Sequence, residues 1–137
     1  MKDITPAQKK VRGVLVALVV QYILGMTISH FGIPPEEETA THQAPYFAKL
    51  AFAAHGVVGL VLVVLSVVVL IVSLKEKNIF IKRVGIAAFL CVVIAFIAGI
   101  ATISLKDSAA ETASFIMGIA FLIALISYGK LFYLLKK

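Results

Sequence analysis

The residue with the most informative chemistry in this sequence is His55. It lies in an apolar run from Leu50 to Leu74 that contains no other ionisable side chain. A polar group in such surroundings costs free energy unless it finds a partner. A neutral imidazole there is typical of four roles: a structural hydrogen bond, an axial ligand of haem iron, a hydrogen-bonding or proton-transferring group for a quinone, and a ligand of copper or zinc.

Each of these roles requires a different set of neighbours. A structural imidazole would bond to a backbone carbonyl or to a hydroxyl group at Thr27, Ser29 or Ser114. A b-type haem would take His55 as one axial ligand and either His30 or Met117 as the other. Both candidates lie near the same end of their apolar runs as His55, so the sequence leaves the structural and haem interpretations open.

A metal site would need more ligands than His55 alone. The remaining histidines are His30 and His42, and His42 follows three glutamates at 36–38. These residues together would suit a copper, zinc or other cation site. The same segment is also typical of a solvated acidic loop, and the spacing of its side chains does not match a known metal motif.

The elements that must position these residues are long apolar segments. The chain has 137 residues, of which 61% are hydrophobic and 15% charged, with a mean hydropathy of +1.06. A soluble domain carries about 25% charged residues. Four segments reach the roughly 20 residues that a membrane-spanning helix needs, at about 11–33, 45–74, 79–105 and 111–135. We therefore expect an all-α integral membrane protein of one domain, residues 1–137, folded as an antiparallel, up-down-up-down four-helix bundle.

The ends of these segments carry helix-boundary signals. Pro45 suits the first turn of the second helix. The sequence KEKN at 75–78 predicts a tight charged turn, and Ser108 with Glu111 predicts a capping box at the start of the fourth helix. Small residues are expected where helices approach closely: Gly25, Ser29, Gly56, Gly59, Gly85, Ala88, Ala95, Gly99 and Gly118.

The distribution of positive charge predicts how the bundle lies in the membrane. Eleven basic residues fall at one end of the predicted helices: Lys2, Lys9, Lys10, Arg12, Lys75, Lys77, Lys82, Arg83, Lys130, Lys136 and Lys137. Only Lys49 and Lys106 fall at the other end. The positive-inside rule then places both termini in the cytoplasm, in a multi-pass protein of the cell membrane. No basic stripe alternates with exposed aromatics, so the lipid bilayer is the expected partner, together with a membrane complex or a second copy, and nucleic acid is not.

The stretches VVQYILGMTISHFG and AHGVVGLVLVVL resemble the beginning of one four-helix half of the haem A synthase family. Gln21, Gly25 and His55 are the matching positions. The resemblance implies a helical haem-binding unit with His55 as a ligand. The family's second haem histidine in such a half lies in the fourth helix, where this chain has none, so the resemblance does not extend to haem A synthesis. The whole chain is also similar to small four-helix membrane proteins of bacteria and archaea that carry no assigned activity.

These patterns favour a small membrane protein that binds haem b or serves as a redox or respiratory accessory subunit, with its site around His55. The alternative from another class is a cofactor-free structural or assembly subunit in which His55 only packs. A transporter of a small neutral solute is a third hypothesis and would need a polar cavity. No hydrolase, zinc-protease or phosphate-loop motif occurs, and the sequence leaves enzymatic activity open.

Overall fold

Four long helices make up almost all of the protein. The computed structural model describes residues 4–31 and 46–136. The helices are α1 (Pro6–Phe31), α2 (Tyr46–Lys75), α3 (Ile79–Ser104) and α4 (Asp107–Leu134), and the described residues contain no strand. Each helix is long and apolar enough to cross a membrane. The predicted all-α fold with four long apolar helices is confirmed.

The start of α1 lies five residues before the predicted start at residue 11, because a capping box extends the helix into the charged segment. The Thr5 backbone N–H donates to Gln8 Oε1 at 3.0 Å, and the Gln8 backbone N–H donates to Thr5 Oγ1 at 3.2 Å. Pro6, between them, occupies the first helical position, where its missing N–H costs nothing. Gln8 is also buried and donates from Nε2 to the Phe132 carbonyl at 3.2 Å, which ties the start of α1 to α4.

The turn between α2 and α3 matches the sequence prediction. Asn78 is the N-cap of α3, and its side-chain oxygen accepts from the Phe80 N–H at 2.9 Å. This cap satisfies one of the amides that a helix leaves unpaired at its start. The charged tetrapeptide therefore ends one helix and begins the next without a longer loop.

The predicted capping box at the start of α4 is wrong. The helix begins at Asp107, its N-cap is Lys106 in an extended conformation, and no side chain caps it. Only Leu105 and Lys106 connect α3 to α4. This short connection starts α4 before Ser108, so that Ser108 lies in the first turn and its carbonyl accepts from the Thr112 hydroxyl at 2.8 Å. The prediction for Pro45 lies outside the described residues.

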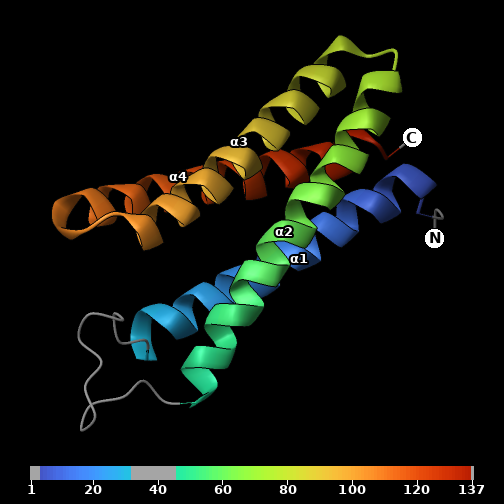
Figure 1. The fold of residues 1–137 in the computed structure, drawn as a ribbon. Helices are drawn as coiled ribbons and strands as arrows, with labels where there is room; N and C mark the ends of the chain where they lie inside the picture. The colour runs from blue at the N-terminus through green and yellow to red at the C-terminus, as the bar shows by residue number, and fades with distance from the viewer. Residues whose placement is uncertain (1–3, 32–45, 137) are drawn as a thin grey trace, which may run out of the picture.

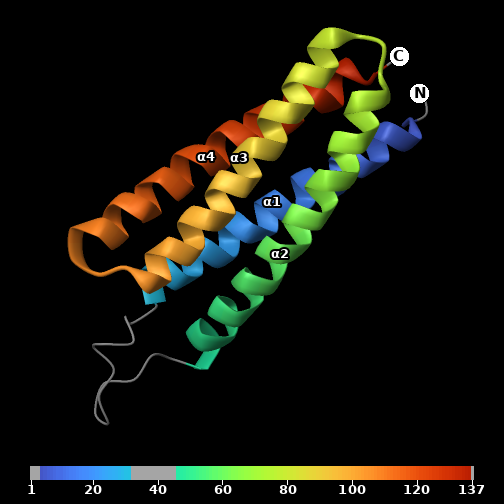
Figure 2. The same cartoon turned by 45° about the horizontal axis from the view of Figure 1, so that its top comes forward.

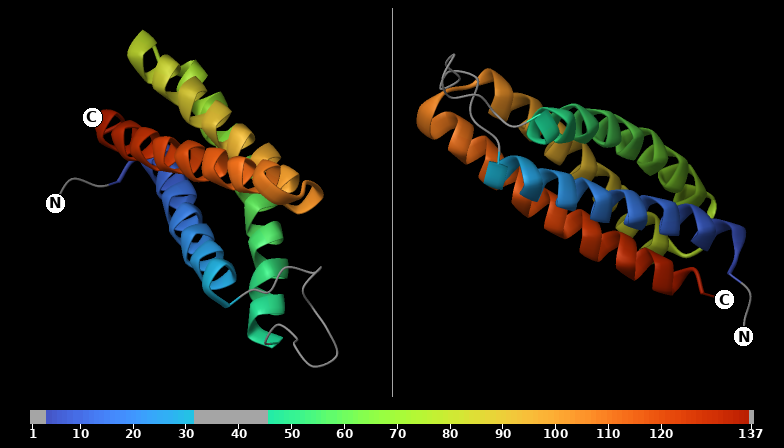
Figure 3. Two further views of the ribbon diagram at one scale, coloured as in Figure 1. Left: turned by 90° about the vertical axis from the view of Figure 1, so that its left-hand side faces the viewer. Right: turned by 90° about the horizontal axis from the view of Figure 1, so that it is seen from below.

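The helices form a ring in which each contacts two neighbours. α1 packs on α2 and α4, and α3 packs on α2 and α4. The beginning of α1, the α2–α3 turn and the end of α4 lie at one end of the molecule (Figure 2), which we call the basic end. The α3–α4 turn lies at the opposite end (Figure 1). Toward that opposite end, the α1–α2 pair and the α3–α4 pair diverge (Figure 3).

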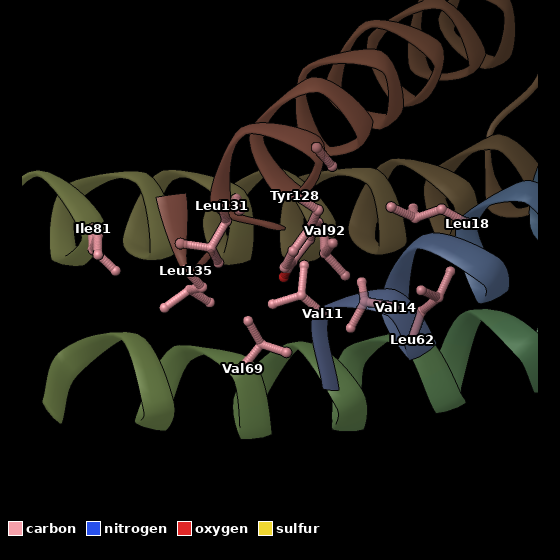
Figure 4. Close-up of a cluster of buried hydrophobic side chains, with 12 residues drawn as sticks. Val11, Val14, Leu18, Leu62, Val69, Ile81, Val92, Tyr128, Leu131 and Leu135 are labelled. Atoms are coloured by element: carbon pink, nitrogen blue, oxygen red, sulfur yellow. The ribbon is translucent and has the colours of Figure 1, made fainter. Parts of the chain in front are cut away.

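The large buried side chains gather in the half of the bundle near the basic end (Figure 4). All four helices contribute to this core: Val11, Val14, Leu18, Leu62, Val69, Ile81, Ala88, Val92, Ala124, Tyr128, Leu131 and Leu135. Among the described residues, the other buried apolar side chains are all alanines: Ala48, Ala51, Ala98, Ala113 and Ala120. The opposite half is therefore held by close contacts between neighbouring helices rather than by a shared core.

The glycines lie in two kinds of place: at close contacts between helices and on exposed helix faces. A Cβ at Gly85 on α3 would lie 2.5 Å from Ser73 Cβ on α2, so these two helices touch as the small-residue pattern predicts. Gly56 and Gly118, in contrast, are exposed, and a Cβ placed on either would have nothing within 4 Å. The predicted packing role of these two residues is therefore wrong, because they lie on outward faces of their helices.

Candidate functional site

His55 lies in the third turn of α2 and faces α1. Its side chain is half-buried. A Cβ placed on Gly25 of α1 would lie 3.4 Å from His55 Cε1 and 3.8 Å from Nδ1. The imidazole therefore packs against Gly25 at a distance where a methyl group would be in ordinary van der Waals contact with it. Figure 1 shows α1 beside α2, as this contact requires.

Gln21 makes the reciprocal contact on the same pair of helices. Its Nε2 would lie 3.3 Å from a Cβ placed on Gly59 of α2, and Phe96 of α3 would lie 3.8 Å from the same position. Gln21 precedes Gly25 by four residues, and His55 precedes Gly59 by four. Each helix thus presents one polar side chain and one glycine on the same face, and each polar side chain fits the glycine of the other helix.

The hydrogen bonds of this pair are incomplete. The His55 ring lies close to the backbone carbonyl of Gln21. Within residues 4–31 and 46–136, His55 Nδ1 and Gln21 Oε1 are both buried without a hydrogen-bond partner. Buried polar atoms almost always have a partner in the protein, a water molecule or a ligand. A neutral imidazole has one nitrogen with a lone pair, which can accept a hydrogen bond or bind a metal ion.

Of the partners expected for a structural histidine, the backbone carbonyl of Gln21 is the one that lies close to the ring. The Thr27 hydroxyl instead donates to the Ile23 carbonyl at 2.9 Å, and Ser29 and Ser114 are exposed. The Gln21 carbonyl and Gly25 both border the imidazole on the side of α1. This arrangement positions His55 for either a structural role or ligation.

The other two candidate ligands lie on different surfaces. Met117 is half-buried on α4, and its sulfur would lie 3.3 Å from a Cβ on Gly99 of α3. Gly99 lies about one turn along α3 from Phe96, which borders Gln21. His30 lies near the end of α1 and its side chain is exposed. The described contacts thus join His55 to α1 and Met117 to α3.

A cluster of metal ligands does not form in the part of the chain that the structure describes. No group of three His, Cys, Asp or Glu side chains there comes together. His42 and the glutamates at 36–38 lie outside the described residues, so the hypothesis of a cation site in that segment stays a prediction.

A second polar group, which the sequence patterns do not reveal, lies in the core near the basic end. Tyr128 is fully buried, and its hydroxyl points into the cluster toward Val11 (Figure 4). The Ser66 hydroxyl lies beside it but donates to the Val63 carbonyl at 2.7 Å. The Tyr128 oxygen is left without a hydrogen bond of good geometry among the described residues. A tyrosine in an apolar helix carries no sequence signal for such burial.

Comparison of this chain with family models, with curated proteins and with solved structures finds no match. The interpretation of the site therefore depends on its own geometry.

Proposed function

We propose that this chain is a multi-pass protein of the cell membrane that binds haem b through His55 and serves as a redox or respiratory accessory subunit. The observation that carries the proposal is the buried Nδ1 of His55, which has no partner among the described residues and lies against Gly25. A neutral imidazole beside a backbone carbonyl in an apolar helix pair has the chemistry of a haem ligand.

The proposal includes an orientation in the membrane. Nine described basic residues lie at the basic end: Lys9, Lys10, Arg12, Lys75, Lys77, Lys82, Arg83, Lys130 and Lys136. Lys49 and Lys106 lie toward the opposite end. An antiparallel bundle with its basic end and both termini in the cytoplasm follows from the positive-inside rule. His55 then lies in the outward half of the membrane.

The residues around His55 would each contribute to haem binding. The Gln21 carbonyl would help to orient the ring, and Gly25 would let α1 approach the ring without a side chain between them. Met117 or His30 would be the second axial ligand, and the divergence of the two helix pairs leaves the outward half without a shared core between them. Haem bound there supplies one-electron transfer. The resemblance to a half of the haem A synthase family supports the same site, whereas the lack of histidine in α4 does not support haem A synthesis.

The test is an absorption spectrum of the purified full-length protein, oxidised and reduced, after expression with haem supply and after addition of haem. We expect a Soret band that His55→Ala abolishes and that the matched control His42→Ala preserves. The spectra of His30→Ala and Met117→Leu are then compared. The variant whose spectrum changes identifies the second ligand. A wild-type protein that stays colourless under both conditions contradicts the proposal.

One observation favours the alternative of a cofactor-free structural or assembly subunit. The two reciprocal contacts, His55 with Gly25 and Gln21 with Gly59, would join α1 to α2 even without a ligand. This alternative predicts a colourless protein in which His55→Ala lowers the stability of the bundle. Thermal unfolding followed by circular dichroism, measured beside the spectra, separates the two functions.

A further inference from the structure

The surface of α3 and α4 at the basic end combines positive charge with an exposed aromatic ring. Lys130 Nζ lies 4.7 Å from the centre of the Phe80 ring, within the range of a cation–π interaction. Phe80 is 43% exposed and Lys130 is also exposed. Lys130 belongs to α4, four residues before its end at Leu134, whereas Phe80 lies in the first turn of α3. The lysine stem therefore runs from inside the apolar helix toward the basic end.

A second cation lies on the same face of α3. Arg83 follows Phe80 by three residues, and residues three apart are neighbours on one face of a helix. Its side chain is exposed. The Lys130 ammonium lies over the Phe80 ring, and Arg83 adds a guanidinium one turn further along the same face. The only acidic residue described at this end of the molecule is Glu76, so the positive charge there greatly exceeds the negative charge.

The face of α3 that begins with Phe80 and Arg83 continues as an apolar stripe. Its next members at spacings of four, three, four and three residues are all exposed: Ala87, Leu90, Ile94 and Ile97. Such spacing keeps residues on one side of a helix. A molecule seated on this stripe would meet two cations at the basic end and only apolar side chains beyond them.

We propose that Phe80, Arg83 and Lys130, which we call the Phe80 site, bind the phosphate group of an anionic membrane lipid whose acyl chains lie along the apolar stripe. A guanidinium binds phosphate through two parallel hydrogen bonds, and a lysine ammonium adds a point charge. The apolar stripe favours a lipid over a soluble phosphate, because a soluble anion has no acyl chains that could contact the stripe. Basic residues at the cytoplasmic side of membrane helices recognise anionic lipids by this chemistry. The inference requires a bilayer and does not depend on haem binding.

The test is native mass spectrometry of the full chain, released from detergent and titrated with dimyristoyl phosphatidylglycerol or with phosphatidylcholine of the same chains. A basic residue that contacts the anionic headgroup contributes about fivefold to affinity. We expect the wild type to bind phosphatidylglycerol more tightly than phosphatidylcholine. Arg83→Gln and Lys130→Gln should each weaken phosphatidylglycerol binding about fivefold, and the double variant about 25-fold.

Lys75→Gln is the matched control, because it removes one exposed charge from the basic end on α2, which does not pack on α4. It should change affinity less than twofold, and Lys130→Arg should retain binding. Equal weakening by Lys75→Gln and Lys130→Gln overturns the proposal, since affinity would then follow net charge alone. Equal affinity of the wild type for the two lipids also overturns it, and this comparison needs no variant to fold. Inorganic phosphate is added as a competitor: if it displaces phosphatidylglycerol, the site binds a soluble anion and the lipid assignment is wrong.

Discussion

Replacing Gly85 by alanine tests how closely α2 and α3 are packed. The new Cβ would lie 2.5 Å from Ser73 Cβ and 2.6 Å from Ser73 Oγ. Carbon atoms pack best at about 3.5–4.0 Å, so the two helices would have to separate by about 1 Å. Ser73 is fully buried, and a change of its rotamer moves Oγ but not Cβ. The clash therefore has to be relieved by the backbone.

The free energy of this change has two opposing parts. Overpacking a buried contact costs about 1–3 kcal/mol. Alanine gains about 1 kcal/mol over glycine in a helix interior. We expect Gly85→Ala to lower the free energy of unfolding by about 1–2 kcal/mol, because the backbone of a helix yields less easily than a flexible side chain.

The assay is reversible unfolding of the full chain in mixed detergent micelles, followed by circular dichroism. Gly129→Ala is the control, since Gly129 is exposed on α4 and a Cβ there has nothing within 4 Å; it should be neutral or stabilising. Ser73→Gly should restore stability to Gly85→Ala, giving a coupling energy of about 1 kcal/mol or more. If Gly85→Ala is as stable as Gly129→Ala, the close approach of α2 and α3 is refuted.

Other variants test separate features. Gly25→Val should displace the His55 ring, because a Cβ at residue 25 is already in van der Waals contact with the ring at 3.4 Å and the branched side chain adds bulk there, and should change the Soret spectrum of haem-loaded protein; Gly56→Val, whose Cβ meets open space, should leave the spectrum unchanged. Gln8→Ala removes the side-chain bond of the capping box to the Thr5 N–H and the bond to the Phe132 carbonyl, so unfolding should become easier by about 1–2 kcal/mol, and no loss of stability would contradict the role of these bonds. Tyr128→Phe removes a buried hydroxyl that lacks a good partner among the described residues, so the unfolding free energy should stay the same or rise; a loss above about 1 kcal/mol would show a hydrogen bond that the geometry does not.

The sequence predicts the four helices, because the length and hydropathy of the apolar segments decide them. It also predicts the end where basic residues collect, because these residues flank the apolar segments. It predicts their boundaries less well. α1 starts at Pro6 because local hydrogen bonds between Thr5 and Gln8 outweigh the charge of the residues that follow. α4 starts at Asp107 because a two-residue connection leaves no room for a later start. A hydropathy pattern reveals neither the Thr5–Gln8 hydrogen bonds nor the short connection before α4.

The candidate site could be predicted in part. His55 is conspicuous as the one ionisable residue of its apolar run, and it lies close to a backbone carbonyl, that of Gln21. Its contact with Gly25 depends on the register of α1 against α2, which a single sequence does not determine. A signal for it was present, since both helices carry a polar residue four positions before a glycine. The burial of Tyr128 depends on the ring of four helices and had no comparable signal.

The confinement of the large core residues to the basic half has a consequence for motion. Separating the ends of the α1–α2 and α3–α4 pairs that lie opposite the basic end would break contacts of alanine and glycine, each of which buries little apolar area. Separating the pairs at the basic end would expose Leu18, Leu131 and Tyr128. Local opening therefore costs least free energy far from the core. A flat cofactor or a hydrophobic partner segment could enter between the two helix pairs there, while the core near the basic end stays intact.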